Sequence, residues 1–258
     1  MLNVFVPGKI ILTGEHAVVA GKLALSVSIT RGVTIRVVSG DMVEYPEDSM
    51  GLINKAIELA GGDKSVCVEI ESELPVGAGL GSSAAVSAAT IKGVREYLGN
   101  PISDDELFEL TMECEKLAHG NPSGIDPAAV IYQGLIAYVK NSPIEKLKLE
   151  KSLQILVVSS GTPSESTKEM VELVAGGDRY PEIVRKIGKI TREIRERLMR
   201  GEEIVKLINE NGILLESLGV VGESAKQLGD ELRDGIWSED YGSWGSQGWI
   251  WDDDRDGG

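Results

Sequence analysis

Hydrophobic and polar residues alternate, at least in part, over the first forty positions of the chain. Residues 3–12 and 23–38 are rich in Val and Ile, which predicts strands joined by turns at Gly21 and Gly32. Residues 65–74 alternate again and predict a further strand, which ends before a proline and a cluster of glycines. The chain therefore begins with a β-rich region.

Helical spacing of apolar residues follows these strands. Residues 51–62 place apolar side chains on one helical face and end in glycine, and small residues over 83–98 favour a closely packed helix. Ser103 and Glu106 form a capping box, which predicts a helix that stops at Gly120. The first half of the chain thus mixes strands and helices.

The second half is predicted to be mainly helical. Residues 134–139 and 153–160 are typical of strands, and the second of these leads into a helix. Beyond Pro181, isoleucines recur on one face of an amphipathic helix, and residues 203–219 indicate another. We expect helices up to about residue 232.

Length and composition fit a globular chain of two domains. The chain has 258 residues, of which 42% are hydrophobic and 26% charged. No apolar run approaches the roughly 20 residues of a membrane span, and no signal-peptide pattern opens the chain, so we expect a cytoplasmic protein. The net charge of −15 argues against general binding to nucleic acid or anionic membranes. Cys67 and Cys114 fit reduced, buried thiols.

The stretch LPVGAGLGSSAAVSAA, residues 74–89, is the clearest candidate for ligand binding. Its glycines at 77, 79 and 81 allow tight turns, and the helix that follows offers N–H groups and a dipole that favour an anion. It is not a Walker A loop, and Ser82 stands where the dinucleotide fingerprint has its third glycine. The stretch predicts a phosphate cradle, with a plain glycine turn as the alternative.

Two further stretches gather polar side chains. PGKIILTGEHAVVAG places Lys9, Glu15 and His16 around a strand-like core. ECEKLAHGNPSGIDPAA holds Glu115 near a helix end and presents Asp126 on a turn. Taken singly, each group would also suit surface or structural residues.

The three stretches together resemble the motifs of the GHMP small-molecule kinases, and within that family the mevalonate kinases. The forms PGKxxLxGEHAVVxG and HGNPSGxD are more selective than the shared glycine loop, and the resemblance covers most of residues 1–232. It implies an α+β fold of two lobes: a ribosomal-protein-like N-terminal lobe with a mixed sheet over 1–150, and an incomplete ferredoxin-like C-terminal lobe over 151–236. The implied activity is phosphorylation of the primary hydroxyl of mevalonate to 5-phosphomevalonate in isoprenoid biosynthesis, with ATP and Mg²⁺.

The resemblance also implies roles for the matched positions. Ser83 and Glu115 would hold Mg²⁺, an ion that prefers oxygen ligands. Asp126 would accept the proton of the substrate hydroxyl, or only orient that hydroxyl, and Lys9 would lower its pKa and stabilise the transferring phosphoryl group. The ATP phosphates would contact the glycine loop, whose residues are Pro75, Gly77, Ala78, Gly79, Leu80, Gly81, Ser82, Ser83, Ala84 and Ala85.

Substrate contacts extend beyond the catalytic pair. The resemblance implies that mevalonate is bound by Lys9 and Asp126, by Glu15 and His16, and by Thr162 from the second domain, whereas His119 is expected to be structural. The partner is thus a small molecule rather than nucleic acid or a membrane. The sequence leaves the oligomeric state open, with a homodimer among the expectations.

Residues 237–258 depart from the family pattern. All four tryptophans lie here, among glycines and aspartates and without a helical or strand period, where the family carries a third motif of the form GAKxTGAGGGG. Tryptophan has the single codon TGG, so a frame displaced to its second base turns every tryptophan into glycine. Permitted codons from Trp237 then give GAKITGAGG. This indicates an out-of-frame tail; a native disordered tail and a remnant of cloning are the alternatives.

Two other functions stay open at this level. Another GHMP kinase, acting on phosphomevalonate or on the 3-hydroxyl of mevalonate, would need additional basic residues, and the opening motif offers only Lys9 and Lys22. A catalytically impaired protein on the kinase scaffold would follow from the missing third motif. The intact Lys9, Ser83, Glu115 and Asp126 argue against loss of chemistry in the first lobe.

Overall fold

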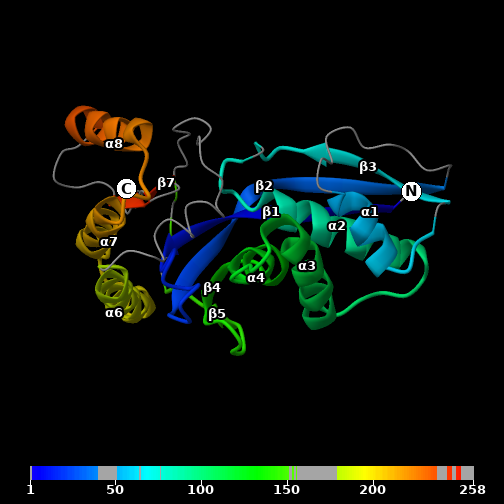
Figure 1. The fold of residues 1–258 in the computed structure, drawn as a ribbon, viewed down its shortest axis with the longest axis horizontal. Coiled ribbons are helices and arrows are strands. Elements are labelled where there is room, and N and C mark those ends of the chain that lie inside the picture. Colours follow the sequence, from blue (N-terminus) through cyan, green and yellow to red (C-terminus); the bar gives the residue numbers. More distant parts are fainter. Residues whose placement is uncertain are drawn as a thin grey trace, which may run out of the picture. The chain divides into compact units, whose positions relative to one another are not determined.

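The chain separates into two compact units in the computed structural model (Figure 1). The first unit comprises Met1–Ile10 and Val27–Gly134, and the second comprises Ile11–Ser26 and Leu135–Gly258. Strands β1 (Leu2–Thr13) and β2 (Ala24–Ser39) each contribute residues to both units. The structure describes residues 2–39, 51–63, 65–75, 77–150, 153, 155, 179–236, 243–245 and 248–250.

The first unit packs helices against an antiparallel sheet (Figure 1). Strands β2 and β3 pair from Val33 opposite Ser72 to Ser39 opposite Val66, so their valines and isoleucines alternate toward the core. After β2 the elements of this unit are α1 (Leu52–Leu59), β3 (Val66–Ser72), α2 (Ser82–Tyr97), α3 (Asp104–His119) and α4 (Ile125–Tyr132). The predicted mixture of strands and helices is confirmed.

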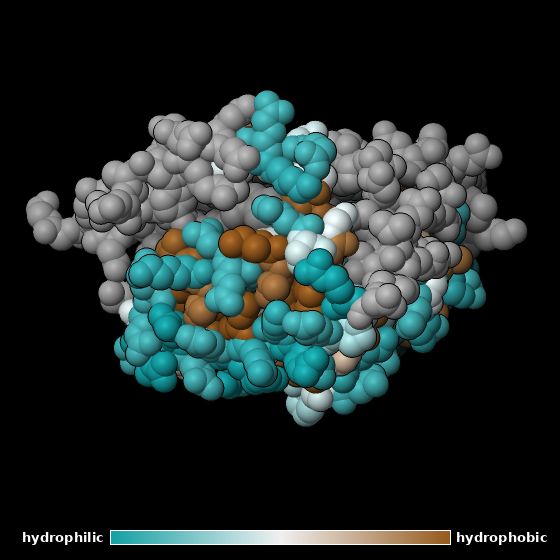
Figure 2. Space-filling model, turned by 60° about the vertical axis from the view of Figure 1, so that its left-hand side comes forward, coloured by the Kyte–Doolittle hydropathy of each residue, from teal (hydrophilic) through white to brown (hydrophobic). Residues whose placement is uncertain are grey.

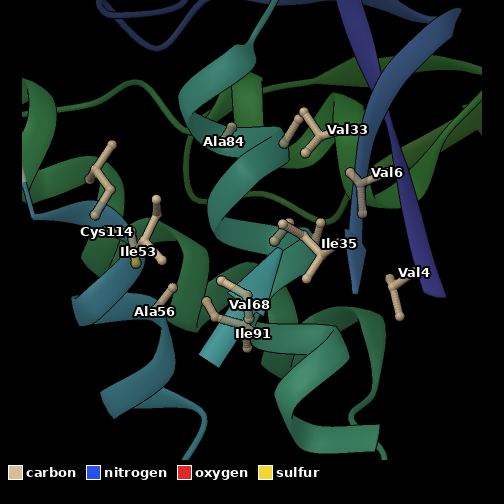
Figure 3. Packing of buried hydrophobic residues seen from close by; sticks show 14 of the residues in the cluster. Val4, Val6, Val33, Ile35, Ile53, Ala56, Val68, Ala84, Ile91 and Cys114 are labelled. Atoms are coloured by element: carbon tan, nitrogen blue, oxygen red, sulfur yellow. The ribbon is translucent and has the colours of Figure 1, made fainter. Parts of the chain in front are cut away.

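The core of this unit lies between the sheet and the helices (Figure 3). Val6, Val33 and Ile35 point from the strands toward α2, where Ala84 and Ile91 are fully buried. Small side chains on α2 allow its backbone to approach the sheet closely, as the run of alanines and serines predicted. This packing holds the N-terminal end of α2 in place.

The second unit is helical over much of its described length. Its elements, besides parts of β1 and β2, are β4 (Leu135–Tyr138), β5 (Glu145–Leu147), α6 (Tyr180–Met199), α7 (Val205–Ser217), α8 (Glu223–Ile236), β6 (Ser243–Gly245) and β7 (Gly248–Ile250). Strand β4 pairs antiparallel with β5, and the sheet order is β1-β2-β4-β5 with β3 on β2. The predicted apolar face of α6 is buried at Ile183, Ile187, Ile190, Ile194 and Leu198.

The exposed surface agrees with amphipathic elements. On the face shown in Figure 2, hydrophobic residues gather in one area that hydrophilic residues border. None of the helices in the described part of the chain is long and apolar enough to cross a membrane.

One sequence prediction needs correction. Gly32 lies within β2 and not at a turn; a Cβ there would meet the Val6 carbonyl oxygen at 2.3 Å and the Phe5 ring at 2.6 Å, so close approach of the chain explains the glycine. Residues 243–245 and 248–250 of the tail form a short antiparallel pair, with Trp244 opposite Trp249. Three-residue strands are too short to show a period, and tryptophan favours strands.

Some predictions fall outside the described residues. The strand predicted over 153–160 is described only at Leu153 and Ile155, and the helix expected after it lies outside the described part. Thr162, the expected substrate contact from the second domain, lies there too. The predicted division at residues 150 and 236 stays a prediction.

Candidate active site

Lys9 of β1 and Asp126 of α4 form an ion pair in the first unit. Lys9 Nζ lies 2.9 Å from Asp126 Oδ1, and the lysine side chain is 1% exposed against 31% for the aspartate. The backbone N–H of Lys9 donates to the Leu80 carbonyl at 2.9 Å, which ties β1 to the glycine loop. A charged group so deeply buried requires a partner, and Asp126 supplies it.

Asp126 lies in the first turn of α4. The sequence predicted a turn here, and the structure shows that the turn ends at Gly124, with φ of 91°, and passes directly into the helix. Pro127 is compatible with this position because the first N–H groups of a helix have no partner within it. Asp126 is the acidic residue in the first turn of α4, a position where acidic side chains are common.

Ser83 and Glu115 make a second contact in the same unit. Ser83 Oγ, at the start of α2, donates to Glu115 Oε1 at 2.8 Å, and Glu115 is 1% exposed in the last turn of α3. Burial, and next the negative charge of Asp126, raise the pKa of Glu115 to about 7, while the Ser83 hydrogen bond and Lys9 oppose that rise. The four predicted residues Lys9, Ser83, Glu115 and Asp126 are therefore brought together.

His119 lies one helical turn beyond Glu115. Its Nε2 is 3.8 Å from Glu115 Oε2, an i,i+4 relation on α3. From the sequence this histidine was expected to be structural; the spacing of four from Glu115 is the signal that could have placed it beside the carboxylate.

The glycine loop presents backbone toward the start of α2. Gly77, Gly79 and Gly81 have φ values of 75°, 72° and 74°, a region that glycine adopts readily. Gly81 caps α2 without a side-chain hydrogen bond, and the N–H of Ala85 is already bonded to the Gly81 carbonyl. The N–H groups at 82 to 84 are those that an α-helix does not satisfy itself, and they are suited to an anion.

The other residues of the loop differ in exposure. Pro75 and Gly77 are exposed, Ala78, Gly79, Ser82 and Ser83 are half-buried, and Leu80, Gly81, Ala84 and Ala85 are buried. Gly81 also accommodates Lys9, because a Cβ there would stand 2.8 Å from Lys9 Cγ. The loop and the lysine therefore depend on each other sterically.

The oxygen groups of this site suit Mg²⁺. The hydroxyl of Ser83 and the buried carboxylate of Glu115 are hard ligands, and a cation would favour the ionised form that burial disfavours. Among the described residues, no group of three or more His, Cys, Asp and Glu side chains could hold a metal.

Glu15 and His16 belong to the second unit, just beyond β1. Glu15 is 4% exposed and accepts a hydrogen bond from Asn211 Nδ2 at 3.3 Å. His16 is half-buried with φ of 59°, its carbonyl accepts from the Tyr180 hydroxyl at 3.2 Å, and burial lowers its pKa to about 4. His16 is thus a neutral imidazole on strained backbone at neutral pH.

Asn211, which contacts Glu15, was not predicted from the sequence. It lies between Ile208 and Leu215 on the buried face of α7, at helical spacing, where an apolar residue would be expected. A polar residue on the apolar face of a helix was the available signal.

Comparisons with known proteins give a consistent family. Residues 49–134 match the family model of the GHMP kinases N terminal domain. A mevalonate kinase of Thermococcus gammatolerans is 35% identical over 269 aligned positions, covering 86% of this chain and 79% of that protein.

Solved structures agree in fold. The crystal structure of the Methanococcus jannaschii mevalonate kinase matches with a TM-score of 0.80 at 24% identity, over 96% of this chain and 89% of that one. An L. major mevalonate kinase in complex with R-mevalonate matches with a TM-score of 0.77 at 24% identity, over 91% and 81%. The predicted two-lobed α+β kinase fold is confirmed, and kinases of this family use ATP. The chain belongs to the GHMP kinase family and, within it, to the mevalonate kinases.

Proposed function

We propose that this chain transfers the γ-phosphoryl group of ATP to the primary hydroxyl of mevalonate, giving 5-phosphomevalonate for isoprenoid synthesis. The relative of 35% identity supports the substrate. The observation that carries the chemistry is the ion pair between Lys9 and Asp126, held in one unit with the Ser83–Glu115 contact. A carboxylate, a fixed cation and a buried oxygen pair are the groups that phosphoryl transfer to a hydroxyl requires.

Asp126 and Lys9 have complementary parts in this reaction. The proton of the hydroxyl passes to a carboxylate oxygen of Asp126, the hydroxyl oxygen bonds to the γ-phosphorus, and the bond from that phosphorus to the β–γ bridging oxygen breaks to release ADP. The Lys9 ammonium, 2.9 Å from Asp126, favours negative charge on the attacking oxygen and on the phosphoryl group. Burial of Lys9 strengthens this effect, because water screens it less.

The remaining groups bind the two substrates. Ser83 and Glu115 would hold Mg²⁺, which neutralises phosphate charge when bound, and the glycine loop from Pro75 to Ala85 would hold the ATP phosphates through backbone N–H groups. Glu15 and His16 would contact mevalonate, with Thr162 as a further contact. We propose the division into residues 1–150, 151–236 and an aberrant tail over 237–258.

A substrate panel tests the function. ADP release with Mg-ATP is measured for mevalonate, phosphomevalonate, homoserine and galactose, and only mevalonate should give turnover. The position of the phosphate, read by phosphorus–proton coupling in NMR, should be the primary carbon. Turnover of phosphomevalonate without turnover of mevalonate, or a 3-phosphate product, would contradict the proposal.

Replacing Lys9 by methionine tests the chemistry. The methionine retains most of the apolar stem but removes the charge, so kcat should fall about 100-fold or more. Lys116→Met is the matched control, because Lys116 is exposed in the same unit and pairs with Glu113 on the surface of α3. A Lys9→Met enzyme with nearly unchanged kcat would rule out the role proposed for Lys9.

A further inference from the structure

Four buried polar side chains meet inside the second unit. They are Thr13 at the end of β1, Glu15 just beyond it, Thr191 of α6 and Asn211 of α7. Glu15 is 4% exposed and the other three are fully buried. Such groups are costly to remove from water unless they are hydrogen-bonded, so their contacts define a specific arrangement.

The contacts form a chain that ends at Glu15. Thr13 Oγ1 lies 2.9 Å from Thr191 Oγ1 and donates to Asn211 Oδ1 at 3.2 Å. Asn211 Nδ2 then donates to Glu15 Oε2 at 3.3 Å. Thr191 Oγ1 also lies 2.9 Å from the Ile187 carbonyl, to which it donates.

The chemistry of these groups determines which way the amide of Asn211 points. An ionised carboxylate only accepts hydrogen bonds, so the NH₂ group of Asn211 must face Glu15 and its carbonyl oxygen must face Thr13. The Thr13 hydroxyl, which has a single proton, then donates it to the amide oxygen. Thr13 therefore selects the orientation of Asn211 that binds Glu15.

We propose that Asn211 is a positioning residue that holds the carboxylate of Glu15 in its binding orientation, and that Thr13 acts through Asn211. This rests on the proposed function, in which Glu15 binds mevalonate. Asn211 constrains the carboxylate through Oε2, and Thr13, on a different element, fixes Asn211 in turn. Pre-organisation of this kind lowers the ordering cost of substrate binding.

A double-mutant cycle of Asn211→Ala and Glu15→Gln tests the proposal in the full chain. Asn211→Ala alone should raise the KM for mevalonate about tenfold, the effect of one charge-assisted hydrogen bond, with a smaller change in kcat. In the Glu15→Gln background the same substitution should change KM less than about twofold. A merely structural role for Asn211 would instead give additive effects on KM, which would overturn the proposal.

The threonine provides a second set of variants that leaves no large cavity. Thr13→Val removes the hydroxyl and should raise KM several-fold, whereas Thr13→Ser retains it and should restore the wild-type KM. Asn209→Ala is the control for Asn211→Ala, because Asn209 is an exposed asparagine on the same helix. Equal KM values for Thr13→Val and Thr13→Ser would overturn the part assigned to Thr13.

Unfolding by urea separates this proposal from the proposed function. The free energy of unfolding is measured for the four proteins of the same Asn211→Ala and Glu15→Gln cycle. We expect a coupling free energy between Asn211 and Glu15 whether or not mevalonate is the substrate. A wild-type protein without mevalonate turnover would refute the proposed function alone. Absence of coupling in the unfolding cycle would overturn the Asn211–Glu15 contact itself.

Discussion

Individual residues at this site combine charge with burial. Lys9 occupies a strand whose neighbouring positions are buried and mostly apolar, and its ion pair with Asp126 provides an opposite charge for the buried ammonium group. The motifs predicted Lys9 and Asp126 as site residues. No local pattern predicts that these two residues, 117 positions apart (126 − 9 = 117), form an ion pair. Asn211 was missed for a related reason: its partner Glu15 is 196 residues away.

Alanine substitutions at Gly81 and Gly99 test how closely the glycine loop packs against Lys9. Both have positive φ, 74° and 71°, but a Cβ at Gly81 would meet Lys9 Cγ at 2.8 Å and one at Gly99 would meet nothing within 4 Å. Alanine at Gly99 should therefore cost only the backbone strain, about 1 kcal/mol of unfolding free energy. Alanine at Gly81 should cost clearly more and should lower kcat/KM for ATP at least about tenfold.

Urea unfolding and steady-state assays of the two variants give both quantities. Equal losses of stability in Gly81→Ala and Gly99→Ala would show that Lys9 does not pack against the loop.

His16 should make stability depend on pH. Burial lowers its pKa in the folded protein to about 4, below the ordinary value of 6.5, so the unfolded chain binds more protons between these values. His16 therefore leaves the free energy of unfolding undiminished above about pH 6.5. As the pH falls toward 4, its protonation in the unfolded chain lowers that free energy by roughly 2 kcal/mol, a value suited to a half-buried imidazole. His16→Asn, which tolerates positive φ, should remove this contribution.

The free energy of unfolding is measured at about pH 7 and at about pH 4.5 for the wild-type protein and for His16→Asn. These two pH values span most of the interval between the unfolded and folded pKa values of His16. If the two lost stability equally on acidification, His16 would not be the group responsible.

Elements were predicted best where a local rule decides them. The helix α3 begins after Ser103 and ends at Gly120, as its capping signals predicted, because caps involve residues only three or four apart. The turn predicted over residues 120–124 lies directly before α4, but the helix itself was not predicted, because its eight residues give little room for a period. Gly32 was misplaced because only the fold brings Val6 and Phe5 against it.

The N-cap of α3 gives a test at this scale. Ser103 accepts a hydrogen bond from the Glu106 N–H at 3.2 Å, so Ser103→Ala should lower the unfolding free energy by about 1 kcal/mol. Ser103→Asp should retain most of the stability, because aspartate is an equally good cap. A loss as large for aspartate as for alanine would show that the cap does not stabilise α3.

The whole chain was predictable as a family and an α+β fold, since its motifs survive in sequence order. The division of the chain into two units was harder to predict from the sequence. Residues 11–26 belong to the same unit as residues 135–258, and no shift in composition marks the boundaries of these stretches. Residues 237–258 remain the clearest departure from the family, and we propose that they are read out of frame.

Restoring the frame tests this proposal. Coding DNA from an independent source should show GAK-type codons in the displaced frame from Trp237 onward. An enzyme translated in that frame should have a much higher kcat than the chain that ends in the tryptophan-rich tail, in an ATP-consumption assay with mevalonate, because it regains a glycine-rich motif. DNA that encodes no such motif in any displaced frame would refute the frameshift, and equal rates would show the motif to be dispensable.

The shared strands β1 and β2 also constrain when the protein can fold. Residues 11–26 leave the ribosome early, yet the rest of their unit starts at Leu135, and Asn211, which holds Glu15, comes 196 residues after it. At about 5–20 residues per second, that segment waits roughly 10–40 s for its partners during synthesis. All residues of the first unit precede Leu135, so a frameshift near residue 237 leaves every residue of that unit, and with it the glycine loop, unchanged.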